Sequence, residues 1–210
     1  MNPNTFRHLS YGVYIISTWD GERPTGCTAN SAMQITSEPA TIAVSINHNN
    51  YTNGLIAANG KFAISILSET SDSALIGRFG FQSGKENDKF TDTEYEVAGG
   101  LPVLNDGCGY IVCNVVNKME TATHTVFLGE VTEAEIKKGG DAMTYAYYHK
   151  VIRGQSPKNA PTYLPPEPKA SEGKEKYICK VCGYEHEGEM DETFKCPICG
   201  VGKDRFVLKG

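Results

Sequence analysis

Two Cys-x-x-Cys-Gly stretches near the end of this 210-residue chain constrain its fold more than any other feature. Cys179 and Cys182 form the first pair, Cys196 and Cys199 form the second, and 13 residues separate the pairs. Each pair can present two thiolates from one turn, so two turns supply the four soft ligands of a tetrahedral metal site. The spacing therefore predicts one metal ion held by these four cysteines. Because iron and zinc both accept four sulfur ligands, the geometry leaves the choice of metal open.

A glycine follows the second cysteine of each pair, at Gly183 and Gly200. Glycine has no Cβ, so it can turn the backbone in a way that points N–H groups at the sulfur atoms. Such hydrogen bonds stabilise the thiolate charge and tune the potential of a bound metal. The pattern thus favours a metal ion whose redox potential is tuned by the surrounding N–H groups.

Charge and composition exclude several classes of protein. Residues 1–155 contain 11 Lys and Arg against 16 Asp and Glu, whereas residues 176–210 contain 6 of each. Neither part predicts the basic surface that binding to nucleic acid requires. No run of about 18 apolar residues predicts a membrane span. The first residues lack the pattern of an export signal, so we expect a cytoplasmic protein.

The remaining cysteines are scattered through the first part of the chain, at Cys27, Cys108 and Cys113. Without ligand spacing, a cysteine in a reducing compartment is most often a small buried hydrophobic residue. We therefore expect all three to be buried.

Alternating β-branched and aromatic residues, flanked by Gly, Asn, Asp and Pro, predict a series of strands. They cover residues 11–18, 27–36, 41–46, 61–67, 110–117 and 124–132. Two short helices are predicted at 51–60 and 71–80, each ending at a glycine in the left-handed conformation, with Ser71 or Asp72 as the N-cap of the second. Many strands and few helices indicate a mainly β barrel or sandwich.

A composition change divides the chain into three segments. Five prolines occur within the first thirteen residues of the stretch that begins at Ser156. Proline-rich segments favour extended, semi-rigid spacers. We predict a first domain over residues 1–155, a linker over 156–176, whose "NAPTY" stretch can still lie against that domain, and a metal-binding domain over 177–210.

The last domain resembles a rubredoxin, the mononuclear iron–tetrathiolate electron carrier. The resemblance rests on "YICKVCGY", "CPICG" and the closing "DRFVL". The gap between the cysteine pairs is shorter than in free-standing rubredoxins and closer to that in the rubredoxin-like domains of rubrerythrins. The resemblance implies iron, an aromatic core of Tyr177, Tyr184, Phe194 and Phe206, and transfer of single electrons. Zinc stays an open alternative.

The first domain resembles the flavin reductase family. The resemblance rests on "GCTANSAMQITSEPATIAVSIN", "YTNGLI", "FAISIL", "DKF" and "HTVFLGEV". It implies an FMN-binding split β-barrel that forms a homodimer and accepts hydride from NAD(P)H. Together the two resemblances point to the high-molecular-weight rubredoxins, flavin–rubredoxin fusions of anaerobic bacteria. These imply an outside acceptor such as a diiron flavoprotein that reduces oxygen or nitric oxide.

The family resemblance and the residue types together nominate the cofactor-binding residues. Thr28, Ala29, Asn30 and Ser31 form a strand edge whose small side chains allow close approach of a flat isoalloxazine ring. Ser45, Asn47, Asn49 and Thr52 precede or open a helix whose N-terminus favours a phosphate. The alternative for this stretch is an ordinary Asn-Asn turn with Thr52 as N-cap. Lys89 corresponds to a basic residue that balances the phosphate, or else is a solvated lysine.

Two further positions are nominated for the chemistry and for the contact between domains. His124 matches a histidine near the nicotinamide, and it is the one catalytic candidate. Hydride transfer itself needs stacked rings and exclusion of water more than an acid or a base. Tyr147, Tyr148 and His149 are candidates for covering the flavin or bridging toward the metal domain, although aromatic residues at a strand end more often belong to the core.

Three functional readings follow. The first is an electron-transfer flavoprotein with iron in its last domain. The second is a flavin reductase whose zinc ribbon docks a partner. The third is a barrel that binds a small ligand, with a metal ribbon for protein contacts. Iron and flavin both absorb visible light, whereas zinc does not, so colour and metal content separate the three.

Overall fold

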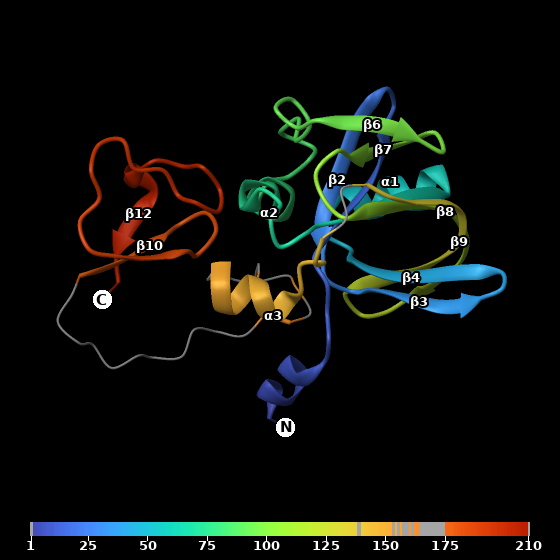
Figure 1. Cartoon of the computed structure of the whole chain (residues 1–210), viewed down its shortest axis with the longest axis horizontal. Helices are drawn as coiled ribbons and strands as arrows, with labels where there is room; N and C mark the ends of the chain where they lie inside the picture. Colours follow the sequence, from blue (N-terminus) through green and yellow to red (C-terminus); the bar gives the residue numbers. More distant parts are fainter. Residues whose placement is uncertain are drawn as a thin grey trace.

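The computed structural model describes residues 2–137, 140–152, 154, 156, 160, 162–163 and 175–209. Figure 1 shows a larger β lobe and a smaller C-terminal lobe, with α2 and α3 between them. The prediction of a mainly β protein is confirmed. None of the described helices is both long and apolar enough to cross a membrane.

The large lobe is built on one antiparallel seven-stranded sheet with the order β2-β1-β5-β8-β9-β4-β3. The two edge strands, β2 and β3, are joined by only Asn30 and Ser31. The sheet must therefore curl until its two edges meet at this turn. The long strands β8 and β9 follow this curvature with two register shifts. The result is a barrel split between β2 and β3. The strands are β1 Tyr14–Asp20, β2 Arg23–Ala29, β3 Ala32–Ser37, β4 Ala40–Asn47, β5 Lys61–Ile66, β8 Gly109–Glu120 and β9 His124–Ile136.

Alternation along the strands fills the barrel with apolar side chains. Phe62 and Phe127 are fully buried in a cluster that also contains Ile16, Val44 and Ile64. Because successive side chains of a strand point to opposite faces, the residues between them point outward. On β4, the outward residues include Ser45 and Asn47, beside the inward Val44 and Ile46. The core of the barrel therefore sets which polar groups face its outer surface.

The two predicted helices are present as α1 Tyr51–Asn59 and α2 Ser73–Phe81. Helix α1 ends at Gly60 in the left-handed conformation, and Asp72 caps α2 by accepting from the Ala74 N–H at 2.9 Å. The predicted end of α2 at Gly80 is wrong, because the helix continues to Phe81 and closes on an extended Gln82. Gly80 instead allows close approach, since a Cβ there would stand 3.4 Å from the side chain of Thr28.

Other elements differ from the sequence-based expectation. The single strand expected over 27–36 is two strands, β2 and β3, because the chain turns at Asn30 and Ser31. Tyr147 and Tyr148 do not lie at a strand end but in a short helical segment. The remaining elements of the large lobe are η1 Pro3–His8, β6 Tyr95–Ala98, β7 Leu101–Leu104, α3 Tyr145–Tyr147 and η2 Tyr148–Ile152.

The small lobe is a three-stranded sheet beside the cysteine turns, with the order β11-β10-β12. Its core contains three of the predicted ligand cysteines together with Ile198 and Phe206. The scattered cysteines behave as expected at Cys27 and Cys113, which are buried, whereas Cys108 is only partly buried. The elements of the small lobe are β10 Lys176–Cys179, β11 Glu185–Glu187, η3 Lys203–Arg205 and β12 Phe206–Leu208.

Candidate functional site

A cavity of about 250 Å³ opens on the large lobe where the ends of β2 and β4 meet α1, α2 and α3. It contains most of the predicted cofactor-binding residues. Predicted residues that line it are Thr28, Ala29, Asn30, Ser31, Ser45, Asn47, Asn49, His124 and Tyr148, and residues not predicted include Ile76, Gly80, Phe81, Tyr145 and Ala160.

Hydrogen bonds hold the Thr28–Ser31 edge in place. The Ser31 hydroxyl donates to the Ser45 carbonyl at 2.9 Å, and the Ser45 N–H donates to the Ser31 carbonyl at 3.1 Å. The Thr28 hydroxyl donates to the Ile76 carbonyl on α2 at 3.3 Å. Since these side chains bond the protein itself, the edge presents a fixed wall of small groups to the cavity. A flat aromatic ligand can approach such a wall closely.

The N-terminus of α1 lies at the opposite side of the cavity. Asn50 is its N-cap and accepts from the Thr52 N–H at 3.0 Å, while Asn49 donates its backbone N–H to the Asn47 side chain at 2.9 Å. Asn47, Asn49, Asn50 and Tyr51 line the cavity here, and Thr52 is buried behind them without lining it. Amide groups and a helix N-terminus together suit an anionic group such as a phosphate.

Lys89 does not line the cavity. Its ammonium is buried, with 3% of the residue exposed, and donates to the Gly26 carbonyl at 2.9 Å and the Phe79 carbonyl at 3.0 Å. It therefore joins β2 to α2 from within the protein. Burial lowers its pKa to about 8, with the neighbouring Cys27 thiol opposing the shift. The alternative of a solvated lysine is wrong, because the side chain is buried.

His124 begins β9 and is register partner of Asn47 on β4. Its Nδ1 hydrogen-bonds the Thr123 hydroxyl at 2.7 Å, and its backbone carbonyl accepts from the Thr121 hydroxyl at 2.7 Å. Desolvation, with His48 as a second cause, lowers its pKa below the ordinary value. His124 is therefore the neutral imidazole at neutral pH, suited to hydrogen bonding more than to charge.

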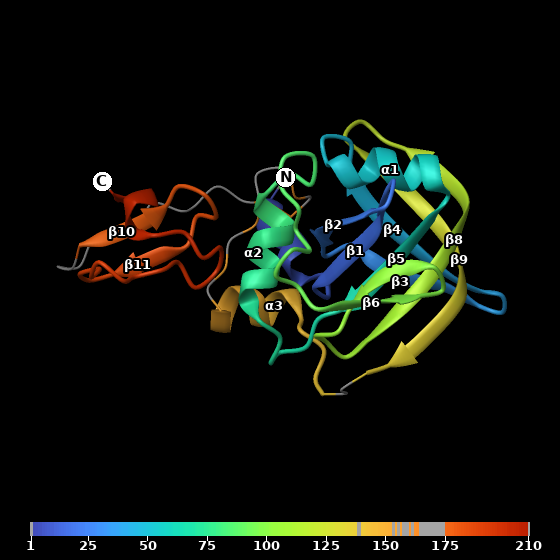
Figure 2. The same cartoon turned by 90° about the horizontal axis from the view of Figure 1, so that it is seen from above.

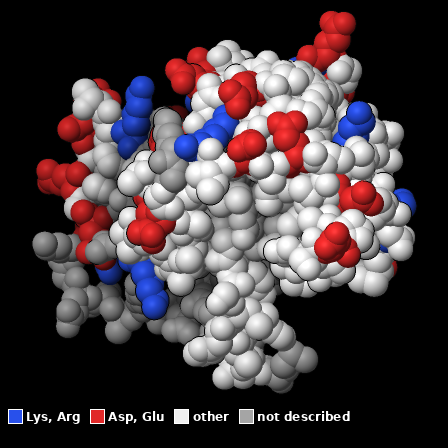
Figure 3. All heavy atoms as spheres, turned by 45° about the vertical axis from the view of Figure 1, so that its right-hand side comes forward, with Lys and Arg blue, Asp and Glu red and all other residues white. Residues whose placement is uncertain are grey.

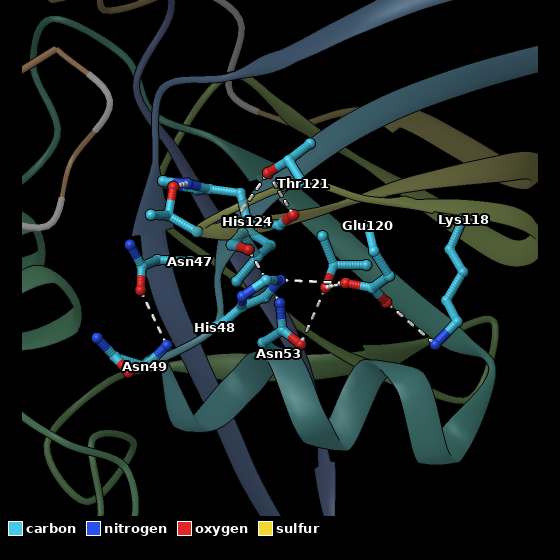
Figure 4. A network of polar contacts seen from close by, with 11 residues as sticks. Asn47, His48, Asn49, Asn53, Lys118, Glu120, Thr121 and His124 are labelled. Atoms are coloured by element: carbon cyan, nitrogen blue, oxygen red, sulfur yellow. Dashed lines mark hydrogen bonds and ion pairs between the residues drawn. The ribbon is translucent and has the colours of Figure 1, made fainter.

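A polar network behind His124 was not anticipated from the sequence (Figure 4). Glu120 accepts from His48 at 3.1 Å and from the Thr125 hydroxyl at 2.8 Å, and pairs with Lys118 at 3.2 Å. These groups tie the β8–β9 turn to the loop before α1. The pairing of β4 with β9 holds Asn47 and His124 side by side at the cavity edge, next to this network. No spacing signal marks this network, because its members come together only through strand register.

The linker begins against the cavity. Ala160 lines it, and the Thr162 hydroxyl accepts from the Asn30 side chain at 3.1 Å and donates to the Tyr145 hydroxyl at 2.9 Å. The idea that part of "NAPTY" lies against the first domain is thereby confirmed for these two residues. The linker from 164 to 174 lies outside the described residues.

The four predicted ligand cysteines come together in the small lobe. Their sulfur atoms all lie within 4.8 Å of one another, with 3.6 Å between Cys179 and Cys199 and 3.4 Å between Cys182 and Cys196. A tetrahedral ion with metal–sulfur bonds of about 2.3 Å needs sulfur atoms roughly 3.8 Å apart. The arrangement therefore fits one tetrathiolate metal ion.

Backbone N–H groups point at these sulfur atoms as predicted. Gly183 and Gly200 both adopt left-handed backbone angles, with φ of 76° and 73°. The next residues, Tyr184 and Val201, donate their N–H groups to Cys182 and Cys199. For Cys196, a hydrogen bond from Cys182 and then the N–H groups of Cys199 and Ile198 lower the pKa to about 5. By contrast, the hydrogen bond to Cys196 and burial raise the pKa of Cys182, and burial raises the pKa of Cys199 to about 12. Four thiols this close together therefore need a cation among them to become thiolates, which is the charge that a bound metal supplies.

Each lobe matches a known protein family. The sequence model of the flavin reductase like domain matches residues 6–156, and that of the rubrerythrin, rubredoxin-like domain matches residues 177–207. The high molecular weight rubredoxin of Moorella thermoacetica is 40% identical over 98% of this chain and 99% of its own length. The chain belongs to the high-molecular-weight rubredoxin family.

Further relatives resemble the large lobe alone. The ferric-chelate reductase (NAD(P)H) of Archaeoglobus fulgidus is 36% identical over 78% of this chain and 98% of its own. The solved flavin reductase PheA2 is 32% identical, with a TM-score of 0.57 over 66% of this chain and 90% of that one. The solved NADH:FAD oxidoreductase of Streptomyces globisporus shares the fold, with a TM-score of 0.62 at 22% identity over 67% of this chain and 84% of that one.

Family and geometry agree on the cofactors. The large lobe is a flavin-binding domain of the flavin reductase family, and its cavity combines a wall of small side chains with a helix N-terminus. The small lobe offers four sulfur ligands to one iron ion. The protein is an oxidoreductase of this family.

Proposed function

We propose that this protein passes electrons from NAD(P)H through FMN to its own Fe(Cys)4 centre, and from there to an outside acceptor. One observation carries the proposal: helix α2 lines the cavity and also contacts the second cysteine turn, and Figure 2 shows α2 between the two lobes. Ile76 and Phe81 of α2 line the cavity, and Ser73 of α2 hydrogen-bonds the second cysteine turn. A metal used only as a structural clip would have no need of this position.

The chemistry requires a carrier that changes from paired to single electrons. A bound flavin accepts a pair of electrons as hydride and gives them up singly, so NAD(P)H and two Fe³⁺ yield NAD(P)⁺, H⁺ and two Fe²⁺. The protein's part is to position the nicotinamide and to exclude water. His124 and Asn47, paired neighbours on β9 and β4 that both line the cavity, would hydrogen-bond the nicotinamide amide.

We also propose that the protein acts as a homodimer. The outward residues Ser45 and Asn47 of the cavity belong to the same face of the β4–β9–β8 sheet as several exposed apolar side chains. Met33 is 65% exposed and Met119 is 59% exposed on this face. Apolar groups grouped near a ligand site suit burial against a second copy. Sedimentation of the full chain should then give twice the monomer mass, and a monomer would contradict this.

The outside acceptor is proposed to be a protein such as a diiron flavoprotein that reduces oxygen or nitric oxide, in the cytoplasm. Figure 3 shows Asp and Glu interspersed with Lys and Arg on the large lobe, with broad uncharged areas between them and no basic patch. The face shown suits contact with a protein partner more than with nucleic-acid phosphates, which require a concentration of positive charge.

The direct test uses the full chain purified from its native host. We expect flavin and iron, one each per chain, and bleaching of the iron absorption after NADH or NADPH is added without oxygen. Reduced flavin beside permanently oxidised iron would contradict the relay. Zinc in place of iron in the active native protein would instead support a reductase with a docking ribbon.

A further inference from the structure

The small lobe sits against the large lobe at one defined place. The Ser73 hydroxyl at the start of α2 donates to the Pro197 carbonyl at 2.9 Å, within the second cysteine turn. Phe81 at the end of α2 and Ile152 of η2 pack into the apolar cluster that surrounds the cysteines. Both views place the small lobe against α2 and α3 (Figures 1 and 2). The contact is therefore made chiefly by the second cysteine turn and one helix.

Gly77 lies at the centre of this contact. A Cβ at this position would stand 1.9 Å from the Ile198 carbonyl oxygen and 2.8 Å from the Cys199 Cα. These are backbone atoms of the metal-binding turn, so they cannot move aside as a side chain does. The angle φ of Gly77 is not in the left-handed region, so the helix itself does not require glycine here. What requires glycine is the close approach of the cysteine turn.

The face of α2 next to this contact borders the cavity. Ile76 and Gly80 line the cavity, and Thr28 of the cavity wall hydrogen-bonds the Ile76 carbonyl. Phe81 does both, because it lines the cavity and packs on the cysteine cluster. Tyr148 also lines the cavity, and the three cysteines Cys182, Cys196 and Cys199 lie near enough to add to the effect of burial in raising its pKa. Helix α2, through residues such as Phe81, thus contacts both the cavity and the metal-binding lobe.

We propose that the Ser73–Phe81 helix is the docking seat for the second cysteine turn, and that Gly77 is the positioning residue that sets the distance between cavity and metal. The proposal rests on the proposed function, because it names the arrangement in which electrons pass within the chain. Gly77 touches neither cofactor. It acts by allowing the Pro197–Cys199 backbone to lie directly on α2.

A methyl group at Gly77 should push the turn away from the helix. Overpacking of this kind shifts an equilibrium by roughly tenfold or more, so the docked fraction should fall accordingly. Alanine is also a better helix former than glycine, so α2 itself should not be weakened. The change thus separates docking from folding.

The test compares Gly77→Ala with Gly54→Ala in the full chain loaded with FMN and iron. Gly54 is a matched control, because it is an exposed helical glycine on α1 with nothing within 4 Å of an added Cβ. Hydrogen exchange at the Ile198 and Cys199 amides, in the turn that lies on Gly77, reports docking without any turnover. Rapid mixing with NADH or NADPH without oxygen then follows flavin reduction and iron reduction separately.

We expect Gly77→Ala to raise hydrogen exchange in the turn and to slow iron reduction. The two factors should multiply to about tenfold, because exchange follows the undocked fraction and electron transfer follows the docked fraction. Flavin reduction should stay within about twofold of the wild type, and Gly54→Ala should match the wild type throughout. Ser73→Ala, which removes one hydrogen bond without a clash, should give the same changes at a smaller size.

Other outcomes decide against the proposal. Unchanged exchange in Gly77→Ala would show that the turn does not rest on Gly77. Exchange raised to the level of an undocked turn, with unchanged iron reduction, would show that the docked arrangement is not the one that transfers electrons. If the wild-type iron is not reduced at all, the proposed function fails, while the exchange comparison still reports whether α2 is the seat.

Discussion

The two lobes keep their folds in different ways. The large lobe has apolar clusters of its own, with Phe62, Phe127 and Ile64 buried without help from any cofactor. In the small lobe, three of the five buried core residues are the ligands Cys179, Cys182 and Cys196. Removing a ligand therefore removes core as well as metal. The flavin site is therefore preformed by the fold of the large lobe, whereas the metal site and the fold of the small lobe form together.

Loss of the metal should affect the stability of the two lobes most differently. We expect Cys196→Ser to unfold the small lobe, because structural tetrathiolate sites contribute about 10–16 kcal/mol to folding. The thermal midpoint of the large lobe should change little. Limited proteolysis would show cleavage within residues 177–209 and an intact barrel. Cys113→Ala, a buried cysteine that is not a ligand, is the control and should keep full metal content. A protease-resistant small lobe without metal would contradict the account.

A core substitution in the large lobe should have the opposite pattern. Phe62 is fully buried in the barrel, so Phe62→Ala should lower the free energy of unfolding of the large lobe by about 3–5 kcal/mol. The iron absorption of the small lobe should persist beyond the lowered midpoint of the barrel. Simultaneous loss of both signals would mean that the two lobes unfold as one unit.

Lys89 gives a smaller, pH-dependent effect confined to the large lobe. Its buried ammonium has a pKa of about 8, so between pH 8 and about 10.4 the unfolded chain binds more protons than the folded one. The free energy of unfolding contributed by Lys89 therefore rises with pH across this window, by up to about 3 kcal/mol. The contribution of Lys89 to stability is least favourable below pH 8.

Denaturant titrations of the wild type and Lys89→Met across this window check the effect. The difference between the two proteins reports Lys89 together with the Cys27 thiol that interacts with it, because other buried acids such as Cys113 and Tyr148 titrate in both. A constant difference would contradict the assigned pKa. FMN affinity measured on the same variant tests whether Lys89 also balances the phosphate.

His124 should give the smallest effect. Its lowered pKa keeps the ring neutral, and hydride transfer needs no acid or base from the protein. We expect His124→Gln to raise KM for NAD(P)H by about tenfold or less, which is the value of one hydrogen bond, with kcat nearly unchanged. Steady-state rates above pH 7 should stay level in both proteins. A large fall in kcat would assign His124 a role in the chemical step.

Sequence patterns predicted the two sites unequally well. The metal ligands follow from spacing alone, because Cys-x-x-Cys turns are local structures. Much of the flavin cavity followed from a family resemblance carried by strand edges and loops. Helix α2 was predicted as a helix, yet its cavity-lining Ile76 and Phe81 were missed, because nothing local shows which side of a short helix faces a ligand.

Long-range register explains the other misses. Neither interpretation of Lys89 included its burial, because its partners, the carbonyls of Gly26 and Phe79, are backbone groups that leave no trace in the sequence. Gly77 carries no sequence signal either, because it is the nearby backbone of Ile198 that requires a glycine there. Contacts between lobes depend on which surfaces meet, and the proline-rich segment between them gives no hint of that.

In the proposed relay, each flavin site passes electrons to the metal of its own molecule. The most direct measurement is the rate of iron reduction after anaerobic mixing with NAD(P)H, repeated over a hundredfold dilution of the protein. If the second cysteine turn docks on α2 of the same chain, iron reduction should follow a first-order rate that does not change with dilution. A rate that falls in proportion to protein concentration would show that electrons pass between separate molecules, and would contradict it.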